Sequence, residues 1–171
     1  SEDFQVVNND IYFYCDVTNA SALKLNTTIK KLEIELLTLG IKYGSIDIPI
    51  NLHINSAGGE ISSALSVVDT IINSKVEIIS IIEGIACSAA TLISVVCPHR
   101  IIYKNAHMMI HQLSCTGLWG KMNELEDEFQ NLKSTMIVIK NIYSEHTKIN
   151  YKELPEILKK DINWNARKCL K

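Results

Sequence analysis

The chain has 171 residues, 47% of them hydrophobic, which suits a single domain with a sizeable core. Its 17 basic and 19 acidic residues are scattered and give a net charge of −2, which argues against a basic surface that binds nucleic acid. Five cysteines without CxxC spacing argue against a disulfide framework and favour a reducing compartment, the cytoplasm or an organellar matrix, and no apolar run is long enough to span a membrane.

The first half of the chain predicts two strand–helix units. Asp10–Val17 is rich in aromatic and β-branched residues, which is typical of a strand. The next segment has leucine and isoleucine at three- and four-residue steps, and it is predicted as an amphipathic helix that stops at Gly40. Residues 45–55 predict a second strand, with Pro49 near its start because proline cannot donate a ladder hydrogen bond. A second helix is expected within residues 56–74.

The second half continues this alternation. Residues 75–86 are nearly all apolar, as expected of a strand that is covered on both faces. The remaining predicted elements are a helix from Ser88 to about Cys97, short strands over 100–105 and 107–113, a long helix over 120–147 and a short helix near 150–160. Strands that alternate with helices predict an α/β fold with a largely parallel sheet.

Two of the strand-to-helix turns carry residues suited to a binding site. Ligands of open α/β sheets bind beyond the carboxyl ends of the strands, where these turns lie. Gly58 and Gly59 follow the second strand, and paired glycines expose backbone N–H groups to a ligand. If the turns are neighbours, the N–H groups of Gly59 and Ala89 converge beside the Ser88 hydroxyl, as an oxyanion hole requires. A phosphate cradle is the weaker alternative, because the Lys-Ser/Thr ending of a P-loop and the GxGxxG spacing are missing.

Ser88 itself has two interpretations. A serine between a strand and a helix is most often an N-cap, whose hydroxyl accepts a hydrogen bond from the first turn of the helix. The other interpretation is a nucleophile, which needs a base and an acid that orients the base. The residues of this turn leave both interpretations open.

The chain offers five histidines as candidate bases. His146 is most simply a cap after the long helix, His53 a core or interface residue, and His99 a turn residue. His107 and His111 have the i, i+4 spacing of metal ligands, but that arrangement requires a helix with a neighbouring Glu, and this stretch predicts a strand. His111, at the end of an apolar strand, is the best candidate base, and a packed structural histidine is its alternative.

Four sequence blocks together resemble one family. INSAGGE, GIACSAATLIS, MMIHQ and KKDINWNARK occur in this order, and the resemblance extends from about Ile11 to the C-terminus. They are similar to the INSPGG, GxAxS, MIHQP and RDxxxxAxEA motifs of the Clp protease proteolytic subunit, ClpP. The resemblance implies a ClpP/crotonase-like α/β spiral of β-β-α units as a single domain over 1–171, with a handle helix in a segment of about 112–147.

The resemblance also implies a set of site residues. It aligns the catalytic serine, histidine and aspartate of the family with Ser88, His111 and Asp161, and the oxyanion-hole residues with Gly59 and Ala89. Without the family motif, Asp161 would be interpreted as an ordinary surface charge near a chain end. The sequence departs from the family at Ala57 and Leu113, which replace prolines, at Leu118 and Trp119 within SCTGLWG, and at Lys159-Lys160, which replace an Asp-Arg pair.

By this resemblance, the chain is a serine endopeptidase that cleaves polypeptides inside two stacked heptameric rings, fed by an AAA+ unfoldase. No metal or organic cofactor is implied. The long helix supports an assembly from the residues themselves, since apolar side chains at three- and four-residue steps from Leu125 to Met136, including Phe129, need a partner surface. Two alternatives stay open, a noncatalytic ring or scaffold subunit and a crotonase-like enzyme that acts on an acyl-CoA.

Overall fold

The computed structural model describes residues 3–44, 47–114, 117 and 119–171. The chain divides into two compact units, Ser1–Met109 with Asn163–Lys171, and Ile110–Ile162. The predicted single domain with a handle over 112–147 stays a prediction. Some positions of the predicted segments lie outside the described residues, namely Ser45, Ile46, Cys115, Thr116 and Leu118. In the described ranges, no helix combines the length and the apolar character needed to cross a membrane.

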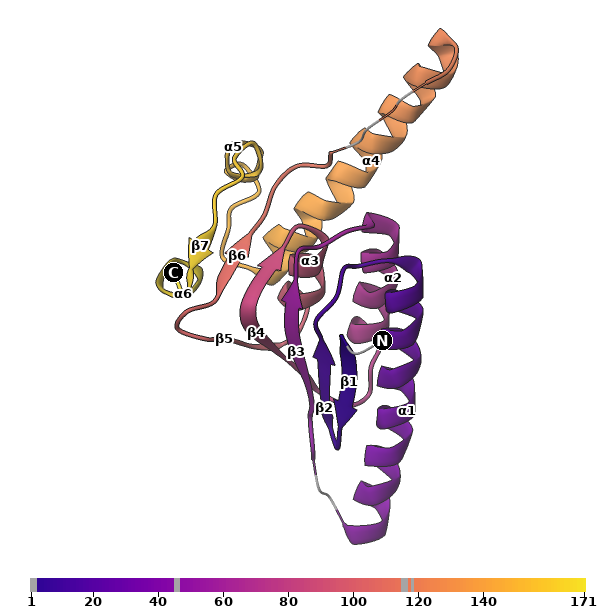
Figure 1. Cartoon of the computed structure of the whole chain (residues 1–171), viewed down its shortest axis with the longest axis vertical. Coiled ribbons are helices and arrows are strands. Elements are labelled where there is room, and N and C mark those ends of the chain that lie inside the picture. The colour runs from indigo at the N-terminus through magenta and orange to yellow at the C-terminus, as the bar shows by residue number, and fades with distance from the viewer. Residues whose placement is uncertain (1–2, 45–46, 115–116, 118) are drawn as a thin grey trace. The chain divides into compact units, whose positions relative to one another are not determined.

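The first unit is built on a seven-stranded sheet (Figure 1). Its strands are β1 (Phe4–Val7), β2 (Asp10–Phe13), β3 (Ile50–Ser56), β4 (Ile78–Cys87), β5 (His99–Ile102), β6 (His107–Met109) and β7 (Trp164–Asn165). They run in the order β1-β2-β3-β4-β6-β7, and β5 also pairs with β4. Only the β1–β2 and β6–β7 pairs are antiparallel. The predicted α/β fold with a largely parallel sheet is confirmed.

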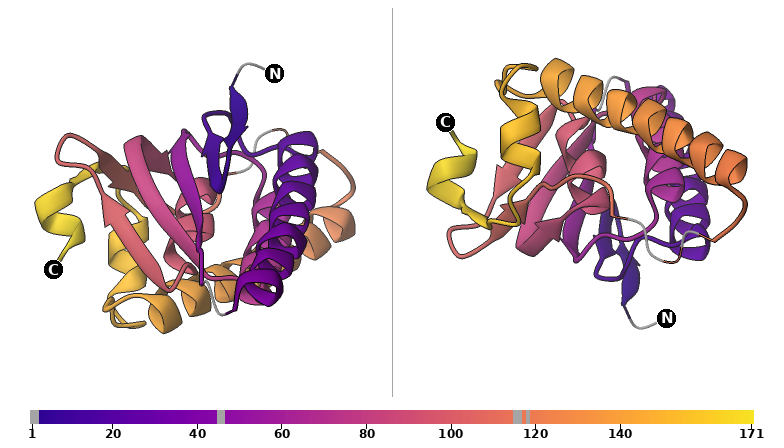
Figure 2. Two further views of the ribbon diagram at one scale, coloured as in Figure 1. Left: turned by 90° about the horizontal axis from the view of Figure 1, so that it is seen from below. Right: turned by 90° about the horizontal axis from the view of Figure 1, so that it is seen from above.

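Three helices cover one side of this sheet (Figure 2). They are α1 (Asn19–Tyr43), α2 (Ile61–Ile72) and α3 (Ala89–Val95), with α1 packed on α2 and α2 on α3. Every residue of α3 is buried, as are most side chains of β3 and β4. The two turns that carry Gly58, Gly59 and Ser88 therefore rest on a packed core.

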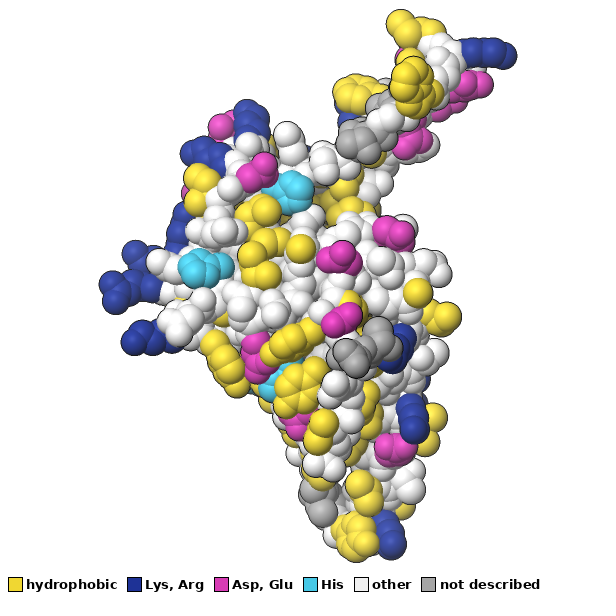
Figure 3. Space-filling model, viewed as in Figure 1, with side chains coloured by type: hydrophobic (Ala, Val, Ile, Leu, Met, Phe, Trp, Pro, Cys, Tyr) yellow, Lys and Arg dark blue, Asp and Glu magenta, His cyan; other side chains and the backbone are white. Residues whose placement is uncertain are grey.

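The ends of α1 follow from local hydrogen bonds. Thr18 caps its start, because the Thr18 hydroxyl accepts from the Ser21 N–H and the Ser21 hydroxyl accepts from the Thr18 N–H. The predicted stop at Gly40 is wrong, since the helix continues to Tyr43. Gly44 ends it at φ 75°, and its N–H donates to the Gly40 carbonyl. Hydrophobic, basic and acidic side chains alternate over the surface of α1 (Figure 3).

Several predicted boundaries also shift. The first predicted strand ends at Phe13, because Val17 pairs instead with the Gly59 turn. The described part of the second predicted strand begins its pairing at Ile50, directly after Pro49. The strand expected over 107–113 ends at Met109, which leaves His111 beyond it. The sequence analysis predicted neither β1 and β7 nor the short helix α6 (Ala166–Cys169).

The described residues of the second unit form two helices, α4 (Met122–His146) and α5 (Leu154–Leu158). The segment that begins this unit is tied to both, since the Leu113 N–H contacts Met136 Sδ at 3.4 Å and the Gln112 N–H donates to the Leu158 carbonyl at 2.7 Å. The last turns of α4 hold its buried residues, Ile139, Ile142 and Tyr143. Its first turns expose apolar side chains, including Met122 and Phe129.

Candidate active site

The two glycine- and serine-bearing turns of the first unit are direct neighbours. A Cβ added at Gly58 would lie 2.5 Å from the Cys87 carbonyl oxygen and 2.8 Å from Ser88 Cβ. No side chain fits in that space, and the φ of Gly58, 97°, also favours glycine. Val17 fixes the turn from its other side, since its N–H donates to the Gly58 carbonyl at 2.7 Å and its carbonyl accepts from the Glu60 N–H at 2.8 Å.

Ser88 has a backbone conformation that is rare for a residue with a side chain. Its φ is 53° and its ψ is −126°, a region that costs a non-glycine residue about 1–3 kcal/mol. The Ser88 N–H donates to the Met109 carbonyl at 2.8 Å, which extends the β4–β6 ladder by one residue. Although Ser88 directly precedes α3, its hydroxyl makes no capping hydrogen bond. The N-cap interpretation therefore does not explain this serine.

The turns also present two backbone donors. Within the described residues, neither the Gly59 N–H nor the Ala89 N–H donates a hydrogen bond. Ala89 N lies 3.1 Å from the position of a Cβ at Gly58, so the donors belong to adjoining turns. Gly59 has a φ of 146°, and a Cβ there would collide with the Val17 carbonyl. An oxyanion hole requires two such donors beside the nucleophile, and its assignment to Gly59 and Ala89 stays a prediction.

His111 and Asp161 approach each other in the second unit. His111 Nδ1 lies 3.6 Å from Asp161 Oδ1, which is too long for a hydrogen bond. The His111 side chain is 20% exposed, whereas that of Asp161 is 77% exposed. The carboxylate therefore lies on the Nδ1 side of the ring.

Two other histidines, His53 and His99, pair with carboxylates, which gives them structural roles. His53 is 7% exposed, with Nδ1 2.7 Å from Glu83 Oε1 and Nε2 2.9 Å from Asp10 Oδ1. Its ring stacks on Tyr12 at 4.4 Å between centroids, so its prediction as a core residue is confirmed. His99 pairs with Glu77 on the surface. The described residues contain no group of three or more His, Cys, Asp or Glu side chains with a geometry that could hold a metal ion.

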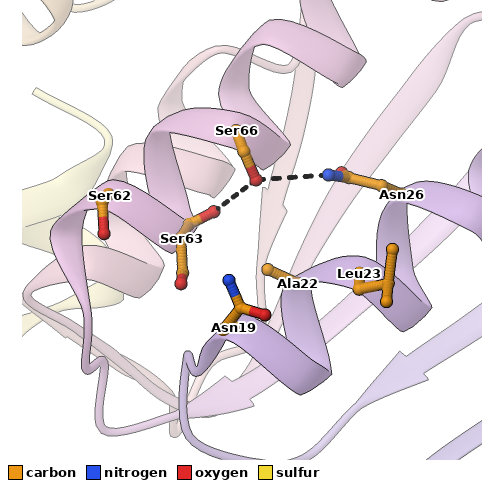
Figure 4. A pocket seen from close by; sticks show the side chains of 7 residues that line it. All are labelled: Asn19, Ala22, Leu23, Asn26, Ser62, Ser63 and Ser66. Carbon is orange, nitrogen blue, oxygen red and sulfur yellow. Dashed lines mark hydrogen bonds between the residues drawn. The ribbon is translucent and has the colours of Figure 1, made fainter.

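A separate pocket of about 240 Å³ lies between the first turns of α1 and α2 (Figure 4). Small polar side chains line much of it, among them Asn19, Asn26, Ser62, Ser63 and Ser66. The Asn26 amide donates to the Ser66 hydroxyl, which donates to the Ser63 carbonyl. Since no acid, base or thiol lines this pocket, it does not compete with the Ser88 turn as a catalytic site.

Ser56 is a supporting residue that the sequence analysis missed. It is 3% exposed, and its hydroxyl accepts a hydrogen bond from the Gly58 N–H at 3.2 Å. A serine two residues before a glycine in a turn is a usable sequence signal for this motif, because short hydroxyl side chains often bond to the backbone two residues ahead. Ser56 helps to hold the turn that contacts Ser88.

Comparison with known proteins identifies the family. Residues 11–171 match the family model described as Clp protease. The chain belongs to the Clp protease family. The ATP-dependent Clp protease proteolytic subunit of Bdellovibrio bacteriovorus is 32% identical over 117 residues, which cover 66% of this chain and 55% of that protein. The match thus spans about half of the relative's length.

A solved structure of the same family shares the fold. A ClpP1 variant from Listeria monocytogenes superposes with a TM-score of 0.77 at 20% sequence identity, covering 91% of this chain and 81% of that one. At this identity the likeness shows the fold alone. The resemblance to ClpP inferred from the four sequence blocks is confirmed by these matches. The roles of Ser88, His111, Asp161, Gly59 and Ala89 stay predictions.

Proposed function

We propose that this Clp protease family member is a serine endopeptidase with Ser88 as its nucleophile. The carrying observation is the Ser88 turn, in which a strained backbone at φ 53° holds a serine whose hydroxyl does not cap the helix, directly against the Gly58 turn. Strained residues persist where the surrounding structure enforces them, and they cluster at active sites. The same strand–turn–helix arrangement exposes a nucleophilic serine in other hydrolases.

His111 is the proposed base, and Asp161 the acid that orients it. The Ser88 N–H bonds to Met109, and His111 follows Met109 by two residues, so covalent geometry keeps the Cα atoms of His111 and Met109 within about 7 Å. A carboxylate on the Nδ1 side keeps the Nε2 lone pair of the neutral ring available for the serine proton. The exposed Asp161 would tighten its contact when the base becomes imidazolium.

The proposed reaction has two halves. Ser88 Oγ attacks the carbonyl carbon of a peptide bond while His111 Nε2 takes the hydroxyl proton, and the N–H groups of Gly59 and Ala89 stabilise the oxyanion. His111 then gives its proton to the leaving amine, which leaves an acyl-Ser88 ester. Water, deprotonated by His111, hydrolyses this ester and restores the serine. No metal or organic cofactor enters these steps.

The proposal includes an assembly. The first turns of α4 expose Met122 at 74% and Phe129 at 56%, and Leu125 and Leu132 of the same stripe are half-buried. An apolar stripe of this kind needs a partner surface, and the same helix of a second copy meets that need in a closed symmetric oligomer. We propose two stacked heptameric rings that enclose the active sites and receive polypeptide from an AAA+ unfoldase.

Hydrolysis of fluorogenic peptides tests this function. The wild-type chain should cleave an internal peptide bond, and Ser88→Ala should abolish the cleavage because no acyl intermediate can form. Ser62→Ala, an exposed serine of α2, is the matched control and should keep full activity. A wild-type protein that assembles but cleaves no peptide would favour the noncatalytic subunit. Thioester turnover that Ser88→Ala leaves intact would favour a crotonase-like enzyme.

A further inference from the structure

Strand β4 changes partner shortly before it reaches Ser88. Its earlier residues pair with β5 and its last three with β6. The register with β3 shifts at the same point, since Ile54 lies opposite Ile82 but Ser56 lies opposite Ala86. Three residues of β4 therefore stand opposite Asn55. A bulge of this kind bends its strand and re-aims the residues that follow.

The Asn55 side chain fills the gap that this bulge opens. Its Oδ1 accepts a hydrogen bond from the Ile85 N–H at 3.2 Å, replacing the ladder partner that the bulge removes. Gly84 completes the fit at φ 78°, because a Cβ there would lie 2.8 Å from Asn55 Oδ1. One side-chain oxygen thus satisfies the bulge and occupies the space beside its glycine.

The Ser88 turn and the Gly58 turn both follow this bulge closely, one after β4 and the other after β3. At the end of β4, Ser88 follows Ile85 by three residues along the chain. On β3, the residue after Asn55 is Ser56, whose hydroxyl holds the Gly58 N–H. A shift of β3 relative to β4 at the bulge would therefore change the contact between Gly58 and Ser88. That contact is so close that not even a methyl group fits between the two turns.

We infer that Asn55 is a positioning residue for Ser88: its amide oxygen holds the β4 bulge in the one form that seats Ser88 against the Gly58 turn. Asn55 itself touches neither substrate nor the reacting atoms. The effect on catalysis rests on the proposed function of Ser88, whereas the effect on the backbone does not. Both can be measured separately.

Two near-isosteric variants separate the oxygen from the bulk of the side chain. Asn55→Leu removes the acceptor, and Asn55→Asp keeps an oxygen in its place. Asn55→Leu should slow fluorophosphonate labelling of Ser88 by about 10²-fold, since a misplacement of about 1 Å has this effect on a reacting group. For peptide cleavage, kcat should fall while KM stays near the wild-type value. Hydrogen exchange at the Ile85 amide should accelerate, and Asn55→Asp should restore most of each property.

Asn51→Leu is the matched control, because the Asn51 side chain lies on the same strand and donates to Asp10 Oδ1 at 3.0 Å, away from the bulge. It should leave the labelling rate of the folded protein unchanged. If Asn55→Leu does not fold, Asn55→Ala removes the acceptor without added branching. The inference would be overturned if Asn55→Leu or Asn55→Ala were labelled at Ser88 as fast as the wild type. It would also be overturned if Asn55→Leu and Asn55→Asp lost labelling to the same extent. If wild-type Ser88 is inert, the proposed function fails, and unchanged Ile85 exchange in Asn55→Leu still overturns the positioning role.

Discussion

His111 Nδ1 faces Asp161 Oδ1 across 3.6 Å, although the Asp161 side chain is 77% exposed. Solvent screens the charge of so exposed a group, so the role proposed for Asp161 is to orient the His111 ring. Asp161→Asn should lower kcat for peptide cleavage by about 10²- to 10⁴-fold, because an amide no longer selects the tautomer with its lone pair on Nε2. Glu156→Gln, an exposed carboxylate of the same unit, is the control and should leave kcat unchanged. Equal rates for wild type and Asp161→Asn would remove Asp161 from the site.

Gly58→Ala should disable the Ser88 turn. The added Cβ would lie 2.5 Å from the Cys87 carbonyl oxygen, so the backbone has to move. We expect loss of fluorophosphonate labelling and a decrease of about 1–3 kcal/mol or more in the free energy of unfolding. Gly44→Ala is the matched control, because its φ of 75° carries the same kind of strain while its surroundings are empty. It should destabilise the protein by about 1 kcal/mol and keep labelling. Labelled Gly58→Ala protein would show that the close approach is unnecessary.

Much of the fold is predictable from local patterns, and the exceptions have physical causes. The apolar periodicity of α1 and the mostly apolar sequence of β4 specify those elements directly. β1 was not predicted, because only Phe4 of its four residues is buried and the strand therefore lacks the alternating burial that gives a strand its sequence pattern. The predicted end of α1 was wrong because a glycine inside a helix is tolerated, and the left-handed residue that ends the helix is Gly44.

The candidate site is predictable to a smaller extent. Paired glycines and a serine after neighbouring strands point to Gly58, Gly59 and Ser88 from the residues alone. Asp161 is indistinguishable from any surface carboxylate without the family motif, since its exposure leaves no apolar pattern around it. The role of Asn55 could not be predicted, because a bulge depends on the register between two strands, which the sequence of either strand does not reveal.

Tyr14 predicts a loss of stability at alkaline pH. Its hydroxyl donates to the Glu83 carboxylate, and this bond, with burial, raises the pKa of Tyr14 from 10.0 to about 12. A raised pKa contributes stability that is complete below pH 10.0 and disappears as the pH rises towards about 12. The difference in unfolding free energy between wild type and Tyr14→Phe should therefore shrink across this interval in urea titrations. Tyr43→Phe, at the exposed end of α1, is the control. A difference that stays constant through the interval would contradict the assigned bond.

Glu83, the acceptor of this hydrogen bond, predicts a loss of stability at low pH. Burial alone would raise the pKa of Glu83, but hydrogen bonds from Tyr14 and His53 outweigh it and lower the pKa below its usual value. A lowered pKa means that the Glu83 contribution is present above the usual value and is lost as the pH falls through the folded-state pKa. Acid titrations of wild type and Glu83→Gln should converge at low pH, and parallel curves would contradict this account.

Phe129→Glu should break the proposed assembly. Phe129 is 56% exposed on the apolar stripe of α4, and a charge there would lose its hydration if a second copy covered it. Light scattering should show the wild type as a large oligomer and the variant as single rings or smaller species. Asn131→Glu places the same charge about 200° around the helix and should leave the oligomer intact. A stable, active wild-type monomer would refute the ring model.

Identification of the nucleophile tests the central claim most directly. A fluorophosphonate probe is added to the native wild-type protein, and the modified residue is located by mass spectrometry of the digested chain. We expect the adduct on Ser88, because only an activated hydroxyl reacts readily, and not on the adjacent Cys87, whose pKa is raised by burial. The adduct should disappear in Ser88→Ala and persist in Ser62→Ala. An adduct on another residue, or equal labelling of wild type and Ser88→Ala, would contradict the account.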